Sequence, residues 1–466
     1  MAITAQTIEI ACRALLDPAS EGPRLSLEDY LSAIPLLDSL ADVPRGTPVL
    51  VRGDVDAKPG PTVGEGDIRL RSMVETLEFG RRLGWKQIVV GHIGRKPEVS
   101  LKAVAARLGE LLHAEVPLIA DWLDEGAMVI TDQAAKAVQS AAAGSVLVLE
   151  NTRRYEIERM LWKATPADAQ KLSQPLAKLA NTMADRLARV YVNEALSAGS
   201  LDASTTIVPL AMDRVALGKY VAGQFDGPMR RCLASQLVVF SGLKTDKLDD
   251  LQAMIDRGTI RWVFTAGSLA MALKKAAAEL DGQDFCLGAA ESPEHKDKPY
   301  YIERSRIEQA RRMLVDGRGK GIRFVLPVDF VLQDGRASET IGPGDQQFDV
   351  GPKTSELFEQ KIGEFIVEQK ERGKGRQPVA FYNGVFGMFE DPRFESGTRR
   401  FVGQLKRLKD AGIEVYVGGG EGGAAVDRYG RPDWITHCFT AGGTVLNALG
   451  SNPVPYLQAL KMARRA

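Results

Sequence analysis

The chain alternates between short apolar runs and longer amphipathic stretches. The apolar runs are four or five residues long and rich in β-branched side chains, whereas stretches such as residues 100–114 repeat apolar positions with a helical period. Strands buried on both faces have continuous apolar runs, and the helices that cover them have one apolar face. The alternation therefore predicts an α/β fold with parallel sheets. The expected strands with their following loops are residues 47–56, 86–96, 145–155, 188–196, 236–247, 260–270, 322–330, 378–390 and 413–423.

Each expected strand ends in a loop that is rich in polar residues or glycine. Ligands of open parallel sheets bind beyond the carboxyl ends of the strands, so these loops are the candidate site. The loops of the first half contain a cationic set with two carboxylates, namely Arg52, Asp54, Asp56, His92, Arg95 and Arg153. Those of the second half contain glycines and lysines, namely Gly242, Lys244, Lys247, Gly267, Gly384 and residues 418–420. This division predicts one lobe for a small anion and another for a phosphate-rich ligand.

Length, charge and cysteine content narrow the class of protein. A chain of 466 residues exceeds one compact core, and the glycine-containing segment 212–236 is the expected hinge between two lobes. Lysine plus arginine number 60, as do aspartate plus glutamate, which argues against nucleic acid or a membrane surface as partner. The four cysteines are scattered, and residues 1–16 predict an amphipathic helix and not an export signal. We therefore expect a cytoplasmic protein.

The candidate anion site depends on arginines that lie on separate loops. Arg69, Arg95 and Arg153 could surround an anion of two or three charges, because guanidinium groups bind phosphate and carboxylate in bidentate fashion. A single surface arginine usually has no such role. His92 alone would more often be a structural histidine, and only its position after a strand makes it a candidate ligand.

The candidate nucleotide site depends on glycines and lysines. In residues 418–423, backbone N–H groups at a helix start could approach phosphate oxygens, and Glu421 could hold Mg²⁺. Lys244 and Lys247 could neutralise a transferring phosphoryl group, and Glu390 could bind a ribose hydroxyl. Each motif has a simpler interpretation: a turn without ligand, a solvated loop, or a buried strand with a turn. The chain contains no P-loop motif.

Ordered motifs from about residue 45 to the end resemble the phosphoglycerate kinase family. They are VLVRGDVD at 49–56, GHIGR at 91–95, VLVLENTRR at 146–154, YVNEAL at 191–196, LPVDFV at 326–331, DVGPKT at 349–354, NGVFGMFE at 383–390 and GGGEGGAAV at 418–426. The resemblance implies two Rossmann-like αβα lobes joined by a hinge helix. We place them at residues 1–215 and 216–440, with residues 441–466 returning to the first lobe. It also implies a monomer that acts on small molecules.

The resemblance implies a role for each matching residue. Asp54 and Asp56 would approach the hydroxyl and carboxylate of 3-phosphoglycerate, Arg69 would hold the accepting carboxylate, and the distal phosphate would bind His92, Arg95 and Arg153. Mg-ATP or Mg-ADP would bind Gly242, Lys244, Lys247, Gly267, Asn383, Gly384, Glu390, Gly419, Gly420, Glu421 and Gly422, with Glu421 at the metal. Arg69, Lys244, Gly420 and Gly443 would be catalytic, with Gly442 beside Gly443. An ionised carboxylate needs no general base, so catalysis reduces to alignment and charge neutralisation.

Several positions depart from the family pattern. The arginine that would contact the distal phosphate is absent from residues 197–205, where Asp202 adds negative charge. Asp56 replaces an asparagine, Lys247 is shifted by one residue, and Gly422 replaces a hydroxyl residue. The expected activity is that of a phosphoglycerate kinase. The alternatives are a divergent acyl-phosphate kinase for another carboxylate and a non-catalytic relative that binds nucleotide.

Overall fold

The computed structural model describes residues 2–21, 25–58, 65–94, 96–242, 247–372, 377–450 and 452–464. The chain divides into two compact units, Met1–Gly227 with Asn452–Ala466, and Pro228–Ser451. The first unit thus extends past residue 215, and only the last part of the segment 441–466 belongs to it. Each unit contains a parallel sheet, which confirms the predicted α/β fold.

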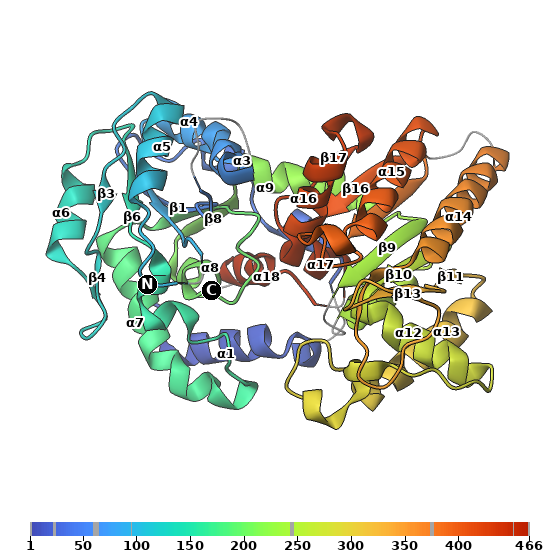
Figure 1. The fold of residues 1–466 in the computed structure, drawn as a ribbon. Coiled ribbons are helices and arrows are strands. Elements are labelled where there is room, and N and C mark those ends of the chain that lie inside the picture. The colour runs from blue at the N-terminus through green and yellow to red at the C-terminus, as the bar shows by residue number, and fades with distance from the viewer. Residues whose placement is uncertain are drawn as a thin grey trace. The chain divides into compact units, whose positions relative to one another are not determined.

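The first unit is built on a six-stranded parallel sheet (Figure 1). In spatial order its strands are β3 (Leu118–Ile119), β6 (Val146–Leu149), β2 (Lys86–Val90), β1 (Pro48–Gly53), β7 (Val190–Glu194) and β8 (Arg214–Leu217). In the register of this sheet, Val51 on the central strand β1 lies between Val89 and Val192. A separate two-stranded sheet pairs β4 (Leu123–Asp124) with β5 (Val129–Ile130).

Helices cover both faces of this sheet. Figure 1 shows α3 (Glu65–Ser72), α4 (Val74–Leu83) and α5 (Lys102–Leu112) on one side, where their apolar residues join Val49 and Val51 in one buried core. On the other side lie α1 (Ala5–Leu16) and α7 (Ala169–Arg186). The remaining helices are α2 (Leu27–Ala33), α6 (Asp132–Ser140), α8 (Ala203–Thr206), α9 (Lys219–Gln224) and α18 (Pro455–Ala463).

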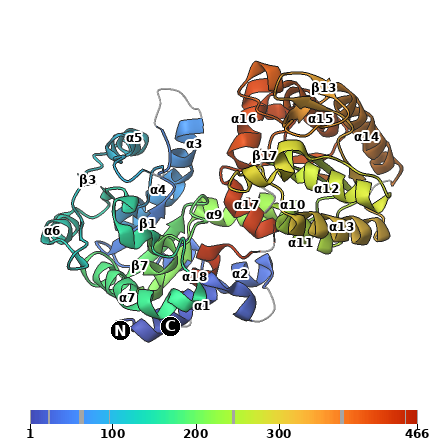
Figure 2. The same cartoon turned by 60° about the horizontal axis from the view of Figure 1, so that its bottom comes forward.

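The N-terminal helix predicted from the sequence is α1. It packs on α7 and lies beside α18, so the first and last helices of the chain are neighbours (Figure 2). Thr4 caps its start by accepting a hydrogen bond from the backbone N–H of Thr7, and the side chain of Gln458 in α18 donates to the carbonyl of Ala14. Residues before the family motifs therefore form an integral part of the first unit.

The second unit repeats this design. Its parallel sheet has the order β11 (Arg323–Val325), β10 (Trp262–Ala266), β9 (Leu237–Gly242), β15 (Val379–Asn383), β16 (Glu414–Gly418) and β17 (His437–Cys438). One face is covered by α12 (Gly267–Leu280) and α13 (Arg304–Gly319), and the other by α14 (Pro352–Glu371) and α15 (Ser396–Asp410) (Figure 1). A small antiparallel sheet contains β13 (Ala337–Ser338), β12 (Phe330–Leu332) and β14 (Gln347–Val350). The other helices are α10 (Arg230–Cys232), α11 (Lys247–Asp256), α16 (Gly419–Tyr429) and α17 (Gly442–Leu449).

Helix α17 belongs to the second unit, although residues 441–466 were expected to return to the first. The physical reason is its close packing on α16: a Cβ added at Gly442 would lie 2.6 Å from the Cα of Gly419. Val445 and Leu449 of the same helix are fully buried. Within the described ranges, no helix is long and apolar enough to cross a membrane.

Candidate active site

The candidate residues of the first unit lie at the carboxyl ends of its central strands. Arg52 is the second-to-last residue of β1, and His92 follows β2. Arg153 lies in a short 3₁₀ turn after β6, and Asp202 directly precedes α8, which follows β7. Because the strands are parallel, their carboxyl ends meet at one edge of the sheet. The fold therefore brings together residues that are far apart along the chain. Arg52 and Asp202, for example, are separated by 150 positions in the sequence.

Arg52 is buried at this edge of the sheet, where its side chain contacts three neighbouring groups. Its side chain is 1% exposed and donates to the hydroxyl of Thr205 at 3.0 Å and to the carbonyl of Gly53 at 2.6 Å. A third nitrogen lies 2.8 Å from Nδ1 of His92. Since an arginine can only donate, this contact requires Nδ1 to accept. Burial is also the main cause that lowers the pKa of His92, so the imidazole is neutral at pH 7.

Arg153 contacts a carboxylate that the family pattern does not contain. Its guanidinium lies 3.2 Å from Oδ2 of Asp202, donates to the carbonyl of Gly94 at 2.8 Å, and stacks 4.6 Å from the ring of Trp162. The indole N–H of Trp162 donates to the other oxygen of Asp202 at 2.8 Å. Asp202 is fully buried, so the arginine and the carboxylate neutralise each other inside the protein.

Glu158 is a second buried carboxyl group near Asp202. It accepts hydrogen bonds from the backbone N–H of Ser204 at 2.8 Å and from the Ser204 hydroxyl at 2.5 Å. Burial, followed by the charge of Asp202, raises the pKa of Glu158 to about 7. Asp202 itself remains ionised: burial opposes this, but hydrogen bonding and the charges of Arg153 and Arg52 lower its pKa to about 2.

Arg69 lies between the two aspartates of the VLVRGDVD motif. Its guanidinium is 3.1 Å from the carboxylate of Asp56 and 3.8 Å from that of Asp54, and a quarter of the side chain (25%) is exposed. Asp54 is buried and also accepts from the hydroxyl of Ser197 at 2.6 Å. Asp56 accepts from the backbone N–H of Gly94 at 2.8 Å. This arrangement leaves Arg69 partly open to an acid, while Asp56 anchors the neighbouring loop.

The structure therefore brings together Asp54, Asp56, Arg69, His92 and Arg153, as the sequence predicts. Arg95 lies outside the described residues. Sequence reasoning missed the pairing of Asp202 with Arg153 and the part played by Trp162. Asp202 was recognisable as an extra charge in a departing motif, but Trp162 lies in a segment without any family motif.

In the second unit, glycines line the carboxyl ends of the central strands. Gly267, with a φ of +65°, follows β10, and a Cβ there would lie 2.7 Å from the carbonyl oxygen of Gly242 on β9. Gly384, with a φ of +95°, follows β15, and a Cβ there would lie even closer to the carbonyl oxygen of Ser241. Side chains are thus excluded at both positions, and the partly exposed backbone at Gly267 is left accessible to a ligand.

The first turn of α16 offers a phosphate site of the expected kind. Gly419, Gly420 and Glu421 form this turn, and Gly420 and Glu421 are exposed. Backbone N–H groups of a first helical turn lack partners within the helix and attract anions. Gly422 is buried against Val417, which excludes it from direct contact with a ligand. Gly443 at the start of α17 has nothing within 4 Å of an added Cβ.

Three side chains near this edge have different surroundings. Asn383 is buried at the end of β15, and its Nδ2 has no hydrogen-bond partner within the part of the chain that the structure describes. Lys247 donates from Nζ to the carbonyl of Ser241 at 2.9 Å. Glu390 is exposed in a turn beyond β15. Lys244 lies outside the described residues, so its predicted role stays a prediction.

Two of the motifs that resemble the family act in helix capping. Asp329 of LPVDFV accepts from the backbone N–H groups of Lys353 and Thr354 at the start of α14. Asp349 of DVGPKT accepts from the backbone N–H of Gly397 at the start of α15. Both aspartates are buried, so they hold the scaffold of the second unit and are not ligands.

A magnesium ion fits this unit only together with a nucleotide. Among the described residues, no group of three or more histidine, cysteine, aspartate or glutamate side chains could hold a metal ion. Magnesium in kinases is commonly held by one or two carboxylates and by the phosphates of the substrate. The exposed Glu421, the unpartnered Nδ2 of Asn383 and the first turn of α16 agree with such a site.

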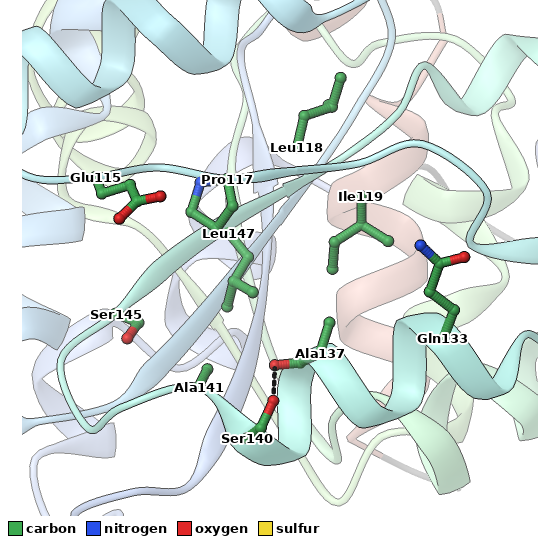
Figure 3. A pocket seen from close by; sticks show the side chains of 10 residues that line it. All are labelled: Glu115, Pro117, Leu118, Ile119, Gln133, Ala137, Ser140, Ala141, Ser145 and Leu147. Carbon is green, nitrogen blue, oxygen red and sulfur yellow. Dashed lines mark hydrogen bonds between the residues drawn. The ribbon is translucent and has the colours of Figure 1, made fainter.

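A surface pocket lies elsewhere in the first unit (Figure 3). It has a volume of about 470 Å³ and is lined by residues around β3 and the start of β6, including Glu115, Leu118 and Ser145. These residues lie at the amino end of β6, opposite the edge that carries the candidate residues. Glu115 is its one charged lining residue, so nothing in this pocket suits an anion.

Comparisons with known proteins agree with this geometry. A family model described as phosphoglycerate kinase matches residues 40–452. The phosphoglycerate kinase of Clostridium novyi is 27% identical over 439 residues, covering 89% of this chain and 96% of the relative. The cytosolic phosphoglycerate kinase of Triticum aestivum is 26% identical over 441 residues, covering 90% and 96%.

Solved structures show the same fold. The phosphoglycerate kinase of Pyrococcus horikoshii OT3 has a TM-score of 0.68 at 22% identity, over 93% of this chain and 100% of that one. The enzyme of Coxiella burnetii has a TM-score of 0.63 at 21% identity, over 90% and 98%. Since the family model spans most of the sequence, the chain belongs to the phosphoglycerate kinase family.

Proposed function

We propose that this protein catalyses reversible phosphoryl transfer between Mg-ATP and the carboxylate of 3-phospho-D-glycerate, giving 1,3-bisphosphoglycerate. The observation that carries the proposal is Arg69, a partly exposed arginine held between two carboxylates at the ligand-binding edge of the first sheet. The glycine-lined edge of the second unit supports nucleotide binding. The relatives named phosphoglycerate kinase support the same activity.

The residues of the first unit bind and orient the acid. A carboxylate with a pKa near ~4 is ionised at neutral pH, so the reaction needs no proton-abstracting group. Arg69 would hold this carboxylate and align one oxygen for attack on phosphorus. Asp54 and Asp56 would keep the guanidinium in place, because both lie within 4.0 Å of it.

The residues of the second unit bind the nucleotide. The backbone N–H groups of Gly419 and Gly420 would bind phosphate oxygens, and Asn383 would offer its unpartnered Nδ2 as a donor. Glu421 would hold Mg²⁺ together with the nucleotide, and the ion would supply positive charge that offsets the charge of the phosphates. Lys247 adds a second source of charge next to β9.

The wider setting follows the relatives. We propose a glycolytic or carbon-fixing role, a cytosolic location and a monomeric state. The name of the Triticum aestivum relative supports the location. Elution of the purified chain at the volume of a 50.7 kDa protein would support the monomer.

The test is a coupled assay of ADP formation at millimolar 3-phosphoglycerate. We expect Arg69→Ala to lower kcat/KM by about 100-fold or more, because an arginine aimed at the reacting carboxylate acts in the transition state. Arg71→Ala is the matched control: Arg71 lies on the same helix and pairs with Asp67 at 2.8 Å. It should change kcat/KM by less than about twofold.

Two results would contradict the proposed function. One is the absence of turnover with 3-phosphoglycerate by a folded wild-type chain. The other is an Arg69→Ala variant that is no worse than Arg71→Ala. Thermal stabilisation by Mg-ADP without turnover on any acid would instead favour a nucleotide-binding relative without catalysis.

A further inference from the structure

The cluster that should receive the far end of the acid already contains an anion. We call the side chains of Arg52, His92, Arg153, Trp162 and Asp202 the Arg52–Arg153 cluster. Within it the carboxylate of Asp202 lies 3.2 Å from Arg153, 3.2 Å from Nδ1 of His92 and 3.8 Å from Arg52. Its other oxygen accepts from the indole of Trp162 at 2.8 Å.

The contacts of Asp202 are those that a bound anion would make. Two arginines and an indole N–H converge on it, and the side chain is fully buried. A phosphate bound by the same guanidinium groups would have to displace this carboxylate or lie beside it. Either arrangement is unfavourable, because like charges at such short range repel each other strongly inside a protein.

The cluster also has little remaining positive charge. The contact of Arg52 with Nδ1 makes His92 an acceptor, hence neutral. Arg52 and Arg153 are then opposed by Asp202 and, when ionised, by Glu158, which is linked to the same turn through Ser204. Lys96, four residues after His92 in the chain, is exposed. The described side chains therefore offer a nearly neutral, polar environment and not a strongly cationic one.

We propose that Asp202 is a specificity-determining residue: its carboxylate serves as an internal anion that weakens binding of a distal phosphate and lets this chain use acids whose far end is an uncharged hydroxyl. This inference rests on the proposed function, since it concerns the acceptor of that reaction. It identifies the acceptors as short 2-hydroxy acids, with or without a distal phosphate, because that phosphate contributes little to recognition.

The experiment compares two acceptors that differ only in the distal phosphate, 3-phospho-D-glycerate and D-glycerate. In the wild-type chain we expect kcat/KM for 3-phospho-D-glycerate to exceed that for D-glycerate by less than about tenfold. The preference is small because the like charge of Asp202 opposes the charge-assisted contacts of the distal phosphate. Asp202→Asn keeps the shape and removes the charge. It should lower KM for 3-phosphoglycerate by about tenfold or more, a larger change than in KM for glycerate.

A binding measurement separates this inference from the proposed function. Inorganic phosphate should raise the melting temperature of Asp202→Asn, because it replaces the missing anion, and should hardly affect the wild-type chain. This result would support the inference even if neither acid were turned over, which would defeat the proposed function alone. Asp329→Asn is the control, since it also disturbs a buried aspartate but releases no arginine.

Three outcomes would overturn the inference. The first is a wild-type kcat/KM for 3-phosphoglycerate that exceeds the value for glycerate by about 1,000-fold or more. This measurement does not depend on the folding of any variant. The second is an Asp202→Asn chain whose KM for 3-phosphoglycerate is unchanged or higher. The third is a phosphate-dependent rise in melting temperature that is the same in Asp202→Asn, Asp329→Asn and the wild type. If Asp202→Asn does not fold, Asp202→Ala with added phosphate takes its place in these comparisons.

Discussion

At the scale of single residues, the second unit depends on a backbone without side chains at the ends of β9 and β10. Gly267→Ala would place a methyl group 2.7 Å from the carbonyl oxygen of Gly242, at a φ of +65°. The clash involves backbone on a buried strand, which cannot move aside easily. We expect the variant to lose about 3 kcal/mol of unfolding free energy in the second unit and to bind Mg-ADP more weakly. Denaturant unfolding and calorimetric titration would measure the two effects.

Gly258→Ala is the matched control for this prediction. Gly258 has a similar φ of +78°, but nothing lies within 4 Å of an added Cβ. It should lose only about 1 kcal/mol, the ordinary cost of a positive φ. Equal losses in both variants would mean that the close approach to Gly242 is unimportant.

The residue scale also shows the limit of reasoning from sequence. Asp54 and His92 were predictable, because each follows an apolar run whose end must lie at the ligand edge. Arg69 was expected on a loop but lies on α3, and its role was predictable only from the resemblance to the family. The local sequence identifies Asp202 as a departure but cannot say which cation it meets. Its partner Arg153 is 49 residues away, and Trp162, which donates to it, lies in a segment without any motif. Such pairings are decided by the packing of distant elements.

At the scale of elements, capping aspartates hold the long helices of the second unit. Asp329→Ala would remove the acceptor of the backbone N–H groups of Lys353 and Thr354, and of the Thr354 hydroxyl. Because these groups are largely buried, they would be left without a partner. We expect a loss of about 2 to 4 kcal/mol in the unfolding free energy of the second unit, measured by chemical denaturation.

Thr131→Ala provides the comparison at a partly exposed helix start. Thr131 caps α6 by accepting from the backbone N–H of Ala134 at 3.2 Å, and water can replace it there. The substitution should lower the unfolding free energy of the first unit by about 1 kcal/mol. A smaller loss for Asp329→Ala than for Thr131→Ala would contradict the proposed capping role.

The elements themselves were largely predictable, and their assignment to units was not. The apolar runs around Val51, Val89 and Val239 are strands, because continuous β-branched runs fit the interior of a parallel sheet. The motifs around Asp329 and Asp349 gave no sign of capping, since the helices that they cap begin 23 and 47 residues later. Helix α17 stays with the second unit because of a glycine contact between Gly419 and Gly442 that no periodicity reveals.

At the scale of the whole molecule, both units contain buried carboxyl groups that affect stability in the same direction. Burial raises the pKa of Glu194 and Glu158 in the first unit, and of Asp349 in the second, to about 7. Their unfolded values are near ~4, so the folded state holds protons that the unfolded state releases. The stabilisation is therefore fully present below about pH 4 and is lost as the pH rises to about 7. Asp202 titrates at about 2, outside this window.

We predict that each unit becomes less stable between pH 5 and pH 8, by up to about 3 kcal/mol per group at ~1.4 kcal/mol for each pKa unit. Since a chain with two units need not unfold in one step, native-state hydrogen exchange of each unit is the suitable measurement. Glu194→Gln should flatten the pH dependence of hydrogen exchange in β7 and α9, because Glu194 accepts hydrogen bonds from the backbone N–H groups of Tyr220 and Val221 at the start of α9. Asp349→Asn should flatten it in α15 alone. Exchange that slows with rising pH, after correction for the intrinsic rate, would show that these carboxyl groups are ionised in the folded protein at pH 5.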